Sequence, residues 1–244
     1  MRVIYEPKGR AREYAELAVN TYLTCDHQCK YCFAPSVSHM KREDYHAVVQ
    51  MRQARFANDF AADCQDMLRN RDTRRVHMNF LSDPYPAIEA TNHITRSCIE
   101  IAKTYGVRCN VLTKGKYHVV RPDFDLFKAA DVHFGVTCCF AEEKSRAEWE
   151  PNASSLDERC RLLVEAHNMG IYTWVSMEPV IYPDQALRFF DALYPWVNLW
   201  KVGKLNYHLH AKAVNWPAFR DEFVRKAKSV NANYIIKKDL LEAK

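Results

Sequence analysis

Cys25, Cys29 and Cys32 stand close together in the segment TCDHQCKYCFAP, in a spacing that lets one loop present three thiols to one centre. Thiolates are the ligands that zinc ions and iron–sulfur clusters prefer in proteins. A structural zinc site needs a fourth ligand, which His27 or His39 is near enough in sequence to supply. Three thiolates alone instead suit a [4Fe-4S] cluster with one open iron. The spacing therefore predicts a metal centre, with the cluster as the favoured interpretation and zinc as the alternative.

The remaining cysteines do not form a second group on one loop. Cys138 and Cys139 are neighbours in a predicted strand, so alternation turns Cys139 inward when Cys138 packs among helices. An odd total of nine cysteines without a secretion signal favours free thiols or metal ligands over disulfides. Four cysteines lie in predicted helices or on an apolar strand face and are expected in the core: Cys64, Cys98, Cys109 and Cys160.

Apolar runs of strand length alternate along the chain with longer stretches of helical period. The predicted strands cover residues 17–24, 76–81, 107–113, 132–138, 171–177, 197–202 and, more weakly, 234–237. The predicted helices cover residues 44–70, 93–105, 123–130, 155–169, 185–193 and 216–230. Strand followed by helix, repeated along the chain, indicates a parallel α/β array. One domain over residues 1–244 is the simplest division, and an open doubly wound sheet also fits the alternation.

Alternation within the strands predicts an unusually polar inner face. In the strand at 132–138, apolar residues point one way, whereas His133 and Thr137 lie on the opposite side. A closed barrel filled by its own side chains favours branched apolar residues inside. The polarity therefore indicates a ligand in the lumen. His77 and His133 on these faces are more typical of core histidines than of acid–base catalysts.

The composition is that of a folded protein with a mildly basic surface. Apolar residues make up 48% of the 244 residues, and the net charge is +5 with both signs interspersed, which permits nucleic acid as a partner without demanding it. Charged residues such as Glu178 and Asp184 interrupt the apolar stretches, so no membrane span is predicted. The start MRVIYEPKGR does not read as a secretion signal, and a cytoplasmic protein is expected.

The spacing Cys25-x3-Cys29-x2-Cys32, followed by an aromatic residue, resembles the cluster motif of the radical S-adenosylmethionine enzymes. Five further segments resemble the branch of that superfamily that contains spore photoproduct lyase: SDPYP, VLTK, EPNASSLDERCRLLVEAHNMGI, SMEPVI and KVGKLN. The resemblance covers about residues 15–239. It implies a partial (β/α)6 TIM-like barrel with the cluster at the carboxyl ends of the strands.

For chemistry, the resemblance implies an enzyme whose open iron chelates the amino and carboxylate groups of S-adenosylmethionine. An electron from an external flavodoxin- or ferredoxin-like donor then cleaves the sulfonium bond, and the resulting 5′-deoxyadenosyl radical abstracts hydrogen from a substrate. The substrate is not identified, and a nucleotide or nucleic acid fits. The alternative is a non-catalytic binding protein stapled by zinc.

The resemblance also implies roles for residues that would contact the methionyl part of the cofactor. Lys114 closes VLTK on the polar face, where a fixed cation can pair with the carboxylate, and Thr137 on the same side can hydrogen-bond to it. Ser82 and Asp83 of SDPYP stand where polar groups meet the amino group. A solvated lysine and an ordinary turn are the plainer interpretations of these residues.

Tyr31 and Phe33 resemble the aromatic residues that cover the cluster and the adenine, although aromatic residues in loops also simply pack. Glu178 in SMEPVI, with Lys204 and Asn206 in KVGKLN, is a candidate for binding the nucleoside or the substrate. An internal ion pair within the sheet explains these residues equally well.

One departure from the lyase pattern concerns the hydrogen donor. The lyase carries a hydrogen-donating cysteine two residues before the serine of its SDPYP-like segment, where this chain has Phe80. Phenylalanine has no labile hydrogen to return to a substrate radical. Cys139 is then a candidate auxiliary donor from another strand, with a plain buried thiol as the alternative. We therefore expect chemistry on a substrate other than the spore photoproduct.

Overall fold

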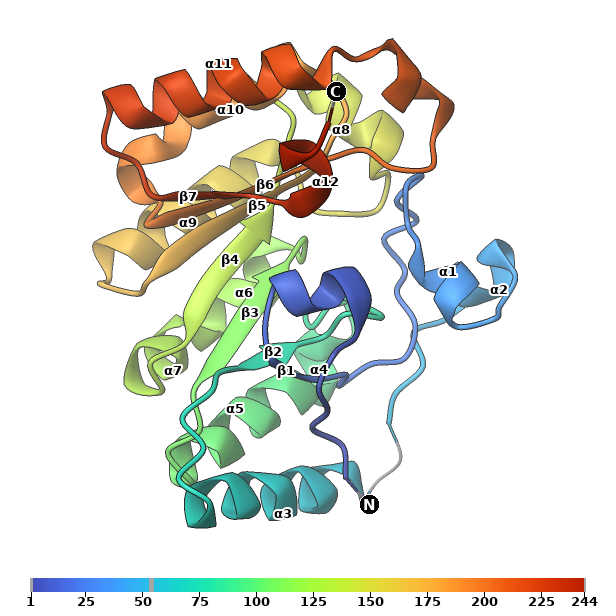
Figure 1. Ribbon diagram of the computed structural model, residues 1–244. Helices are drawn as coiled ribbons and strands as arrows, with labels where there is room; N and C mark the ends of the chain where they lie inside the picture. Colours follow the sequence, from blue (N-terminus) through green and yellow to red (C-terminus); the bar gives the residue numbers. More distant parts are fainter. Residues whose placement is uncertain (1, 53–54, 244) are drawn as a thin grey trace.

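The computed structural model describes residues 2–52 and 55–243 and contains one sheet of seven parallel strands in the order β1 to β7 (Figure 1). The strands are β1 (Leu17–Val19), β2 (Val76–Met78), β3 (Cys109–Thr113), β4 (His133–Thr137), β5 (Thr173–Val180), β6 (Leu199–Lys204) and β7 (Tyr234–Ile236). Each strand pairs with the next along the chain, so β1 and β7 are the two edges of an open sheet. This winding in one direction confirms the predicted partial TIM-like barrel and excludes a doubly wound order.

The longer helices connect successive strands, as the alternation predicts. They are α3 (Phe56–Arg69), α5 (Ile94–Thr104), α7 (Phe124–Ala129), α8 (Glu143–Trp149), α9 (Leu156–Asn168), α10 (Pro183–Leu193) and α11 (Trp216–Ser229). The shorter ones are α1 (Ala34–Val37), α2 (Arg42–Ala47), α4 (Glu89–Asn92), α6 (Tyr117–Val120) and α12 (Lys238–Leu241), with 3-10 turns η1 (Gly9–Glu13), η2 (Arg121–Asp123), η3 (Tyr194–Trp196) and η4 (Leu209–Ala213). None of these helices is long and apolar enough to cross a membrane, within the part of the chain that the structure describes.

The strand registers confirm the predicted division into two faces. His77 pairs with Asn110, and Asn110 with His133, so these polar side chains share the inner face. The residues of the opposite parity are buried apolar side chains packed in the main core, among them Val76, Val111, Val136, Val175 and Val202. One face of the sheet therefore carries branched apolar residues that pack in the core, and the other, inner face carries the polar residues.

The predicted helix at 44–70 is wrong at residues 48–51, and residues 53–54 lie outside the described residues. After α2, Val48 turns to an extended conformation, and residues 48–51 run back along the chain that follows β1. The Leu23 amide donates to the Gln50 carbonyl at 2.9 Å, and Thr24 and Gln50 share a further hydrogen bond. This pairing over long sequence separation overrides the helical period of the local sequence.

Strand β1 is shorter than predicted because amide side chains replace its backbone ladder. The Asn20 side-chain oxygen accepts hydrogen bonds from the amides of Phe80 and Leu81, at 2.9 and 3.0 Å. The Asn79 side-chain oxygen accepts one from the amide of Thr21 at 2.9 Å. These bonds hold the loops after β1 and β2 together at the carboxyl edge of the sheet.

Candidate functional site

The three predicted ligand cysteines lie in the cysteine loop, residues 25–33, between β1 and α1. All three are free thiols, and Cys25 and Cys29 are buried. Lys114, at the end of β3, and Tyr45 of α2 each lie close enough to interact electrostatically with all three cysteines. The thiols therefore gather around one place, with an ammonium group and a phenol beside them.

Burial keeps these thiols protonated in the free protein. It raises the pKa of Cys29 to about 12, although Lys114 works in the opposite direction, and it also raises the pKa of Cys25 and Cys32. Soft metals displace thiol protons when they bind. Three thiols on one loop, two of them buried, thus fit a thiolate-bound cluster. A second donor set overlaps them, because ligand atoms of Cys25, Asp26 and His27 lie within 4.8 Å of one another.

Helix α2 fixes the backbone of the cysteine loop. The Arg42 guanidinium donates hydrogen bonds to the carbonyls of Cys29 and Cys32. The His46 Nδ1 atom lies 2.7 Å from the Cys25 carbonyl oxygen. The sequence shows Arg42 and His46 only as residues of an ordinary helix, and nothing local marks their contact with a loop that precedes them.

A buried ion pair supports the other side of the cysteine loop. Glu150 and Arg159 are both fully buried and lie 2.6 Å apart. Glu150 accepts a hydrogen bond from the Tyr31 hydroxyl. Burial alone would raise the pKa of Glu150, but Arg159 and Lys114 lower it below the usual value, so the carboxylate is charged. Arg159 also donates to the Thr137 carbonyl at 2.9 Å, which ties the pair to the end of β4.

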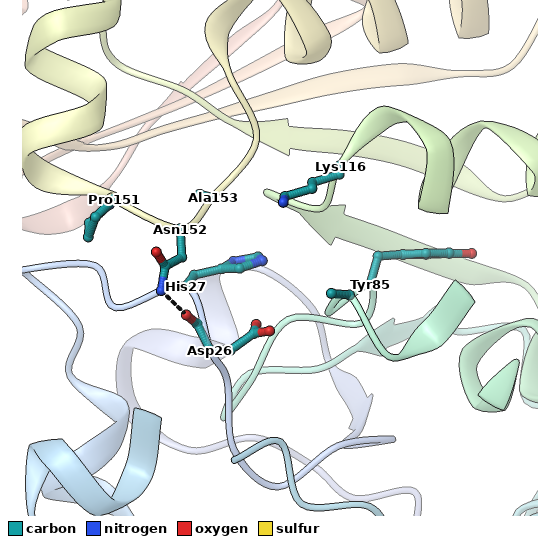
Figure 2. Close-up of a pocket in the computed structure, with 8 residues that line it drawn as sticks. Asp26, His27, Tyr85, Lys116, Pro151, Asn152 and Ala153 are labelled. Atoms are coloured by element: carbon teal, nitrogen blue, oxygen red, sulfur yellow. Dashed lines mark hydrogen bonds between the residues drawn. The ribbon is translucent and has the colours of Figure 1, made fainter. Parts of the chain in front are cut away.

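The segment after Glu150 holds the cysteine loop by its backbone. The Asn152 amide group donates to the Asp26 carbonyl at 3.0 Å, the dashed line of Figure 2, and the Ser154 amide donates to the Lys114 carbonyl at 3.0 Å. Ser155 caps α9 and forms a capping box with Glu158, which confirms the start of the helix predicted over residues 155–169.

Lys114 and Asp83 meet as neighbours at the ends of β3 and β2. Asp83 accepts hydrogen bonds from the Lys114 amide at 2.7 Å, from the Tyr85 amide at 2.8 Å and from the Thr113 hydroxyl. Its carboxylate also lies 3.6 Å from the His27 ring. Burial by itself would lower the pKa of Lys114, but Cys29, Glu150 and Asp83 raise it. Lys114 is thus a partly buried cation whose charged state Glu150 and Asp83 favour.

Other predicted cofactor residues take different positions. Ser82 bonds to the Tyr22 carbonyl at 2.8 Å and to Asn79 at 2.6 Å, so it ties two loops together. Thr137 is buried at the end of β4. Tyr31 packs against the main core, whereas Phe33 is 60% exposed. The roles of these residues toward a cofactor stay predictions.

Cys139 is fully buried in the main core, just after β4. It lies within electrostatic reach of Glu150 and Tyr31, and so close to the cysteine loop. Phe80, at the position of the lyase's hydrogen donor, packs against the His77 ring in a tilted arrangement with centroids 4.4 Å apart. The donor position therefore faces the lumen, and in this chain it carries an aromatic ring.

Glu178 belongs to a separate group of side chains on the inner face of β5 to β7. It accepts a hydrogen bond from the Tyr14 hydroxyl at 2.6 Å and forms an ion pair with Lys237. The Tyr14 hydroxyl also lies 2.8 Å from the Ser176 hydroxyl. Lys201 donates to the Tyr14 carbonyl at 3.0 Å. The internal ion pair considered for Glu178 is present, and sequence reasoning missed Tyr14, Lys201 and Lys237.

A pocket of about 320 Å³ lies beside the cysteine loop, where the loops after β1, β2, β3 and β4 meet (Figure 2). His27 points between the β2 and β4 loops, opposite Lys116. The predicted cofactor residues are not among its described lining, which comprises Asp26, His27, Tyr85, Ala87, Lys116, Pro151, Asn152 and Ala153.

Comparison with known proteins supports the fold. No model of a known protein family matches the chain. A protein of Methanocaldococcus jannaschii, described only as uncharacterized, is 25% identical over 173 residues, which are 70% of this chain and 62% of that protein. SuiB of Streptococcus suis bound to S-adenosylmethionine superposes with a TM-score of 0.66 at 10% identity, over 90% of this chain and 49% of SuiB. A spore photoproduct lyase variant with bound AdoMet and dinucleoside spore photoproduct gives 0.62 at 17% identity, over 90% of this chain and 64% of the lyase.

The chain therefore has the fold of the radical S-adenosylmethionine enzymes, as the sequence resemblance predicts. Among these enzymes it is similar to spore photoproduct lyase, whose branch the short segments indicate. The chain spans less than two thirds of the length of these relatives. Their likeness shows the fold, and the activity, the reaction and the substrate belong to the proposal below.

Proposed function

We propose that this protein is a radical S-adenosylmethionine enzyme in which Cys25, Cys29 and Cys32 hold a [4Fe-4S] cluster. The observation that carries the proposal is the gathering of three free thiols about Lys114 at the carboxyl ends of parallel strands. Barrel enzymes place their active sites at that edge. When bound, the cluster and S-adenosylmethionine supply a carbon-centred radical that abstracts a hydrogen atom from a substrate.

The chain's own residues would bind and orient the cofactor. The carboxylates of Glu150 and Asp83 favour the charged state of Lys114, so it can form an ion pair with the methionyl carboxylate. Thr137, on the neighbouring strand, can add a hydrogen bond to the same group. The ion pair of Glu150 with Arg159 fixes the Tyr31 side chain beside the thiols, and the burial of this region excludes water.

A zinc-stapled binding protein is the second candidate function. The observation that favours it is the close approach of Cys25, Asp26 and His27, whose donor atoms differ in softness but suit zinc. In that arrangement a four-coordinate zinc ion would need only one of Cys29 and Cys32 as its fourth ligand. The two candidates therefore differ in the identity of the metal and in the number of thiols that hold it.

The proposed enzyme needs an external electron donor, for which a flavodoxin- or ferredoxin-like protein is proposed. Support comes from exposed apolar side chains on the segment around α1 and α2, next to the thiols: Phe33, Val37, Val48 and Met51. Apolar side chains gathered on a surface are typical of protein contact sites. A nucleotide or nucleic acid remains the proposed substrate class, and the cytoplasm the proposed location.

Anaerobic purification tests the proposed function directly. We expect brown protein with about four irons per chain, in contrast to a colourless protein with one zinc ion. Addition of dithionite and S-adenosylmethionine should release methionine and 5′-deoxyadenosine, which mass spectrometry detects. Protein that holds one zinc and leaves S-adenosylmethionine intact would refute the proposal and favour the binding protein.

The substrate is proposed to differ from the spore photoproduct. Phe80 cannot return a hydrogen atom, and Cys139 lies buried after β4 rather than after β2. Incubation with the photoproduct should give slow cofactor cleavage without repair to thymine. Efficient formation of thymine would contradict this assignment while leaving the radical chemistry in place.

A further inference from the structure

The inner faces of β5 to β7 bring together buried amines that the proposed radical chemistry does not use. Lys201 of β6 is only 9% exposed, and Lys237, which follows β7, is 5% exposed. Both ammonium groups lie over the ring of Tyr14, at 5.4 and 3.1 Å from its centroid. Lys201 also lies 5.1 Å from the Trp174 ring. We call the group formed by Tyr14, Trp174, Lys201 and Lys237, together with Ser176 and Glu178, the lysine wall.

The lysine wall has more positive charge than its close carboxylates neutralise. Lys237 is paired with Glu178. Lys201 donates to the Tyr14 carbonyl, and among the described residues no carboxylate lies at ion-pair distance from it. Burial and Lys237 lower the pKa of Lys201 to about 8, which the more distant Glu13 partly opposes. A buried cation without a close counter-charge is unfavourable, and an anion bound beside it would relieve that cost.

His77 provides a second, independent observation. Its side chain is buried, and its Nδ1 atom has no hydrogen-bond partner within residues 2–52 and 55–243. The His77 ring lies against the rings of Tyr14 and Trp174, at centroid distances of 6.0 and 6.3 Å. These are the rings that flank Lys201. A buried nitrogen without a hydrogen-bond partner and an ammonium group without a close carboxylate thus adjoin the same two aromatic side chains, those of Tyr14 and Trp174.

The strand register relates this place to the cofactor side of the lumen. Thr137 pairs with Ser176, and Ser176 pairs with Lys201, so the three lie in one row across β4, β5 and β6. Adjacent strands are about 4.8 Å apart, which separates Thr137 from Lys201 by about 10 Å. That distance suits a small organic substrate that extends from the cofactor to the lysine wall.

We propose that the lysine wall binds an oxyanion of the substrate, a phosphate or a carboxylate, with Lys201 as its ion-pair partner and His77 as a further hydrogen-bond partner. This deepens the proposed function, on which it rests, by assigning the substrate to the acidic compounds. Tyr14 and Glu178 are partly exposed, so solvent reaches the wall beside them. Tetrahedral and planar oxyanions share the required chemistry, and the experiment separates them.

Calorimetric titration of the anaerobically purified protein with inorganic phosphate and, separately, with acetate tests the proposal at constant ionic strength. We expect saturable binding of one probe or both. Lys201→Met should weaken it by about tenfold or more, the loss expected for a bond between charged groups. Lys201→Arg keeps the charge and should retain most of the affinity. Lys228→Met removes an exposed lysine of α11 and should have no effect.

The two probes also identify the source of the oxyanion, since a preference for phosphate indicates a phosphorylated substrate and a preference for acetate indicates a carboxylic acid. Absence of saturable binding, or equal binding by the wild type and Lys201→Met, would overturn the proposal. Thermal unfolding of each variant shows whether it is folded. Iron is measured in the same samples, so that low iron content with Lys201-dependent binding counts against the radical enzyme and not against the oxyanion site.

Discussion

The cysteine loop and the lysine wall lie toward opposite edges of one sheet and are built in opposite ways. The cysteine loop carries its three thiols in a single segment after β1, and other segments hold its backbone and the side chains beside the thiols. The lysine wall takes its side chains from several distant elements, with Tyr14 before β1, Lys201 on β6 and Lys237 after β7 beside the residues of β5. Both of its ammonium groups lie over the Tyr14 ring, Lys201 also lies over the Trp174 ring, and Lys201 donates to the Tyr14 carbonyl.

One residue type behaves differently in the two regions. Lys114 beside the thiols has a raised pKa because Cys29, Glu150 and Asp83 outweigh its burial. Lys201 has a lowered pKa because burial and Lys237 act in the same direction. The protein therefore supplies the counter-charges of Lys114 itself and leaves Lys201 without one. The comparison indicates that the two lysines serve different ligands.

The largest effect is expected at the cysteine loop. Cys29→Ala removes one of three thiols and should abolish iron loading, because two thiolates from the loop cannot retain a cluster with an open iron. The brown colour and the iron content measure the result. Cys160→Ala, which removes a half-buried thiol on α9, is the matched control and should keep both. A Cys29→Ala protein with its full iron content would show that the loop does not hold the cluster.

The next effect concerns the ion pair that supports the cysteine loop. Arg159→Met leaves Glu150 as a buried charge without its partner and should lower the free energy of unfolding by about 3–5 kcal/mol. Arg225→Met, which breaks the exposed pair with Glu222 on α11, should change it by less than about 1 kcal/mol. Chemical denaturation compares the two variants. Equal losses of unfolding free energy in the two variants would mean that the buried ion pair stabilises the protein no more than the exposed one does.

A smaller effect is expected on cofactor binding. Lys114→Met should weaken S-adenosylmethionine binding by about 1.5–3 kcal/mol, the range for a hydrogen bond to a charged group. That is roughly a 10- to 150-fold rise in the dissociation constant. Lys103→Met on α5 serves as the control, since this lysine is exposed and far from the thiols in sequence. Unchanged affinity in Lys114→Met, with the cluster intact, would return Lys114 to a structural role.

The same contrast explains how much the sequence could predict. The seven strands follow from local alternation, and the three cysteines share one short segment, so both are visible without knowledge of the fold. The split of the helix predicted at 44–70 depends on the contact of Gln50 with Leu23, which has no local signature. The support from Arg42 is equally invisible, because its partners precede it in another element.

The lysine wall was recognised only in part, through Glu178. Its partner Lys237 is 59 residues away in sequence, and Tyr14 is 164 residues away. The weak pattern at 234–237 gives no reason to place its last residue in the lumen. Tyr14 lies before the first strand, in a segment without strand periodicity. Sites assembled from single residues of distant elements require the three-dimensional structure, whereas sites carried by one loop do not.

The smallest predicted effect tests the charge of the lysine wall through the pH dependence of stability. Lys201 has a pKa of about 8 in the folded protein, against an ordinary value of 10.5 when the chain is unfolded. Between these values the unfolded chain binds more protons than the folded one, so this group makes the protein more stable as the pH rises from about 8 toward 10.5.

Below pH 8 both states are protonated, and the buried charge is unfavourable throughout. Lys201→Met should therefore be more stable than the wild type at pH 7, and the difference should shrink by about 2–3 kcal/mol by pH 10. Denaturation of both proteins at each pH cancels the titration of all other groups, with Lys228→Met as the exposed control. A difference that stays constant with pH would mean that Lys201 titrates as an ordinary lysine, and the lysine wall would then lack the unpaired charge that distinguishes it from the cysteine loop.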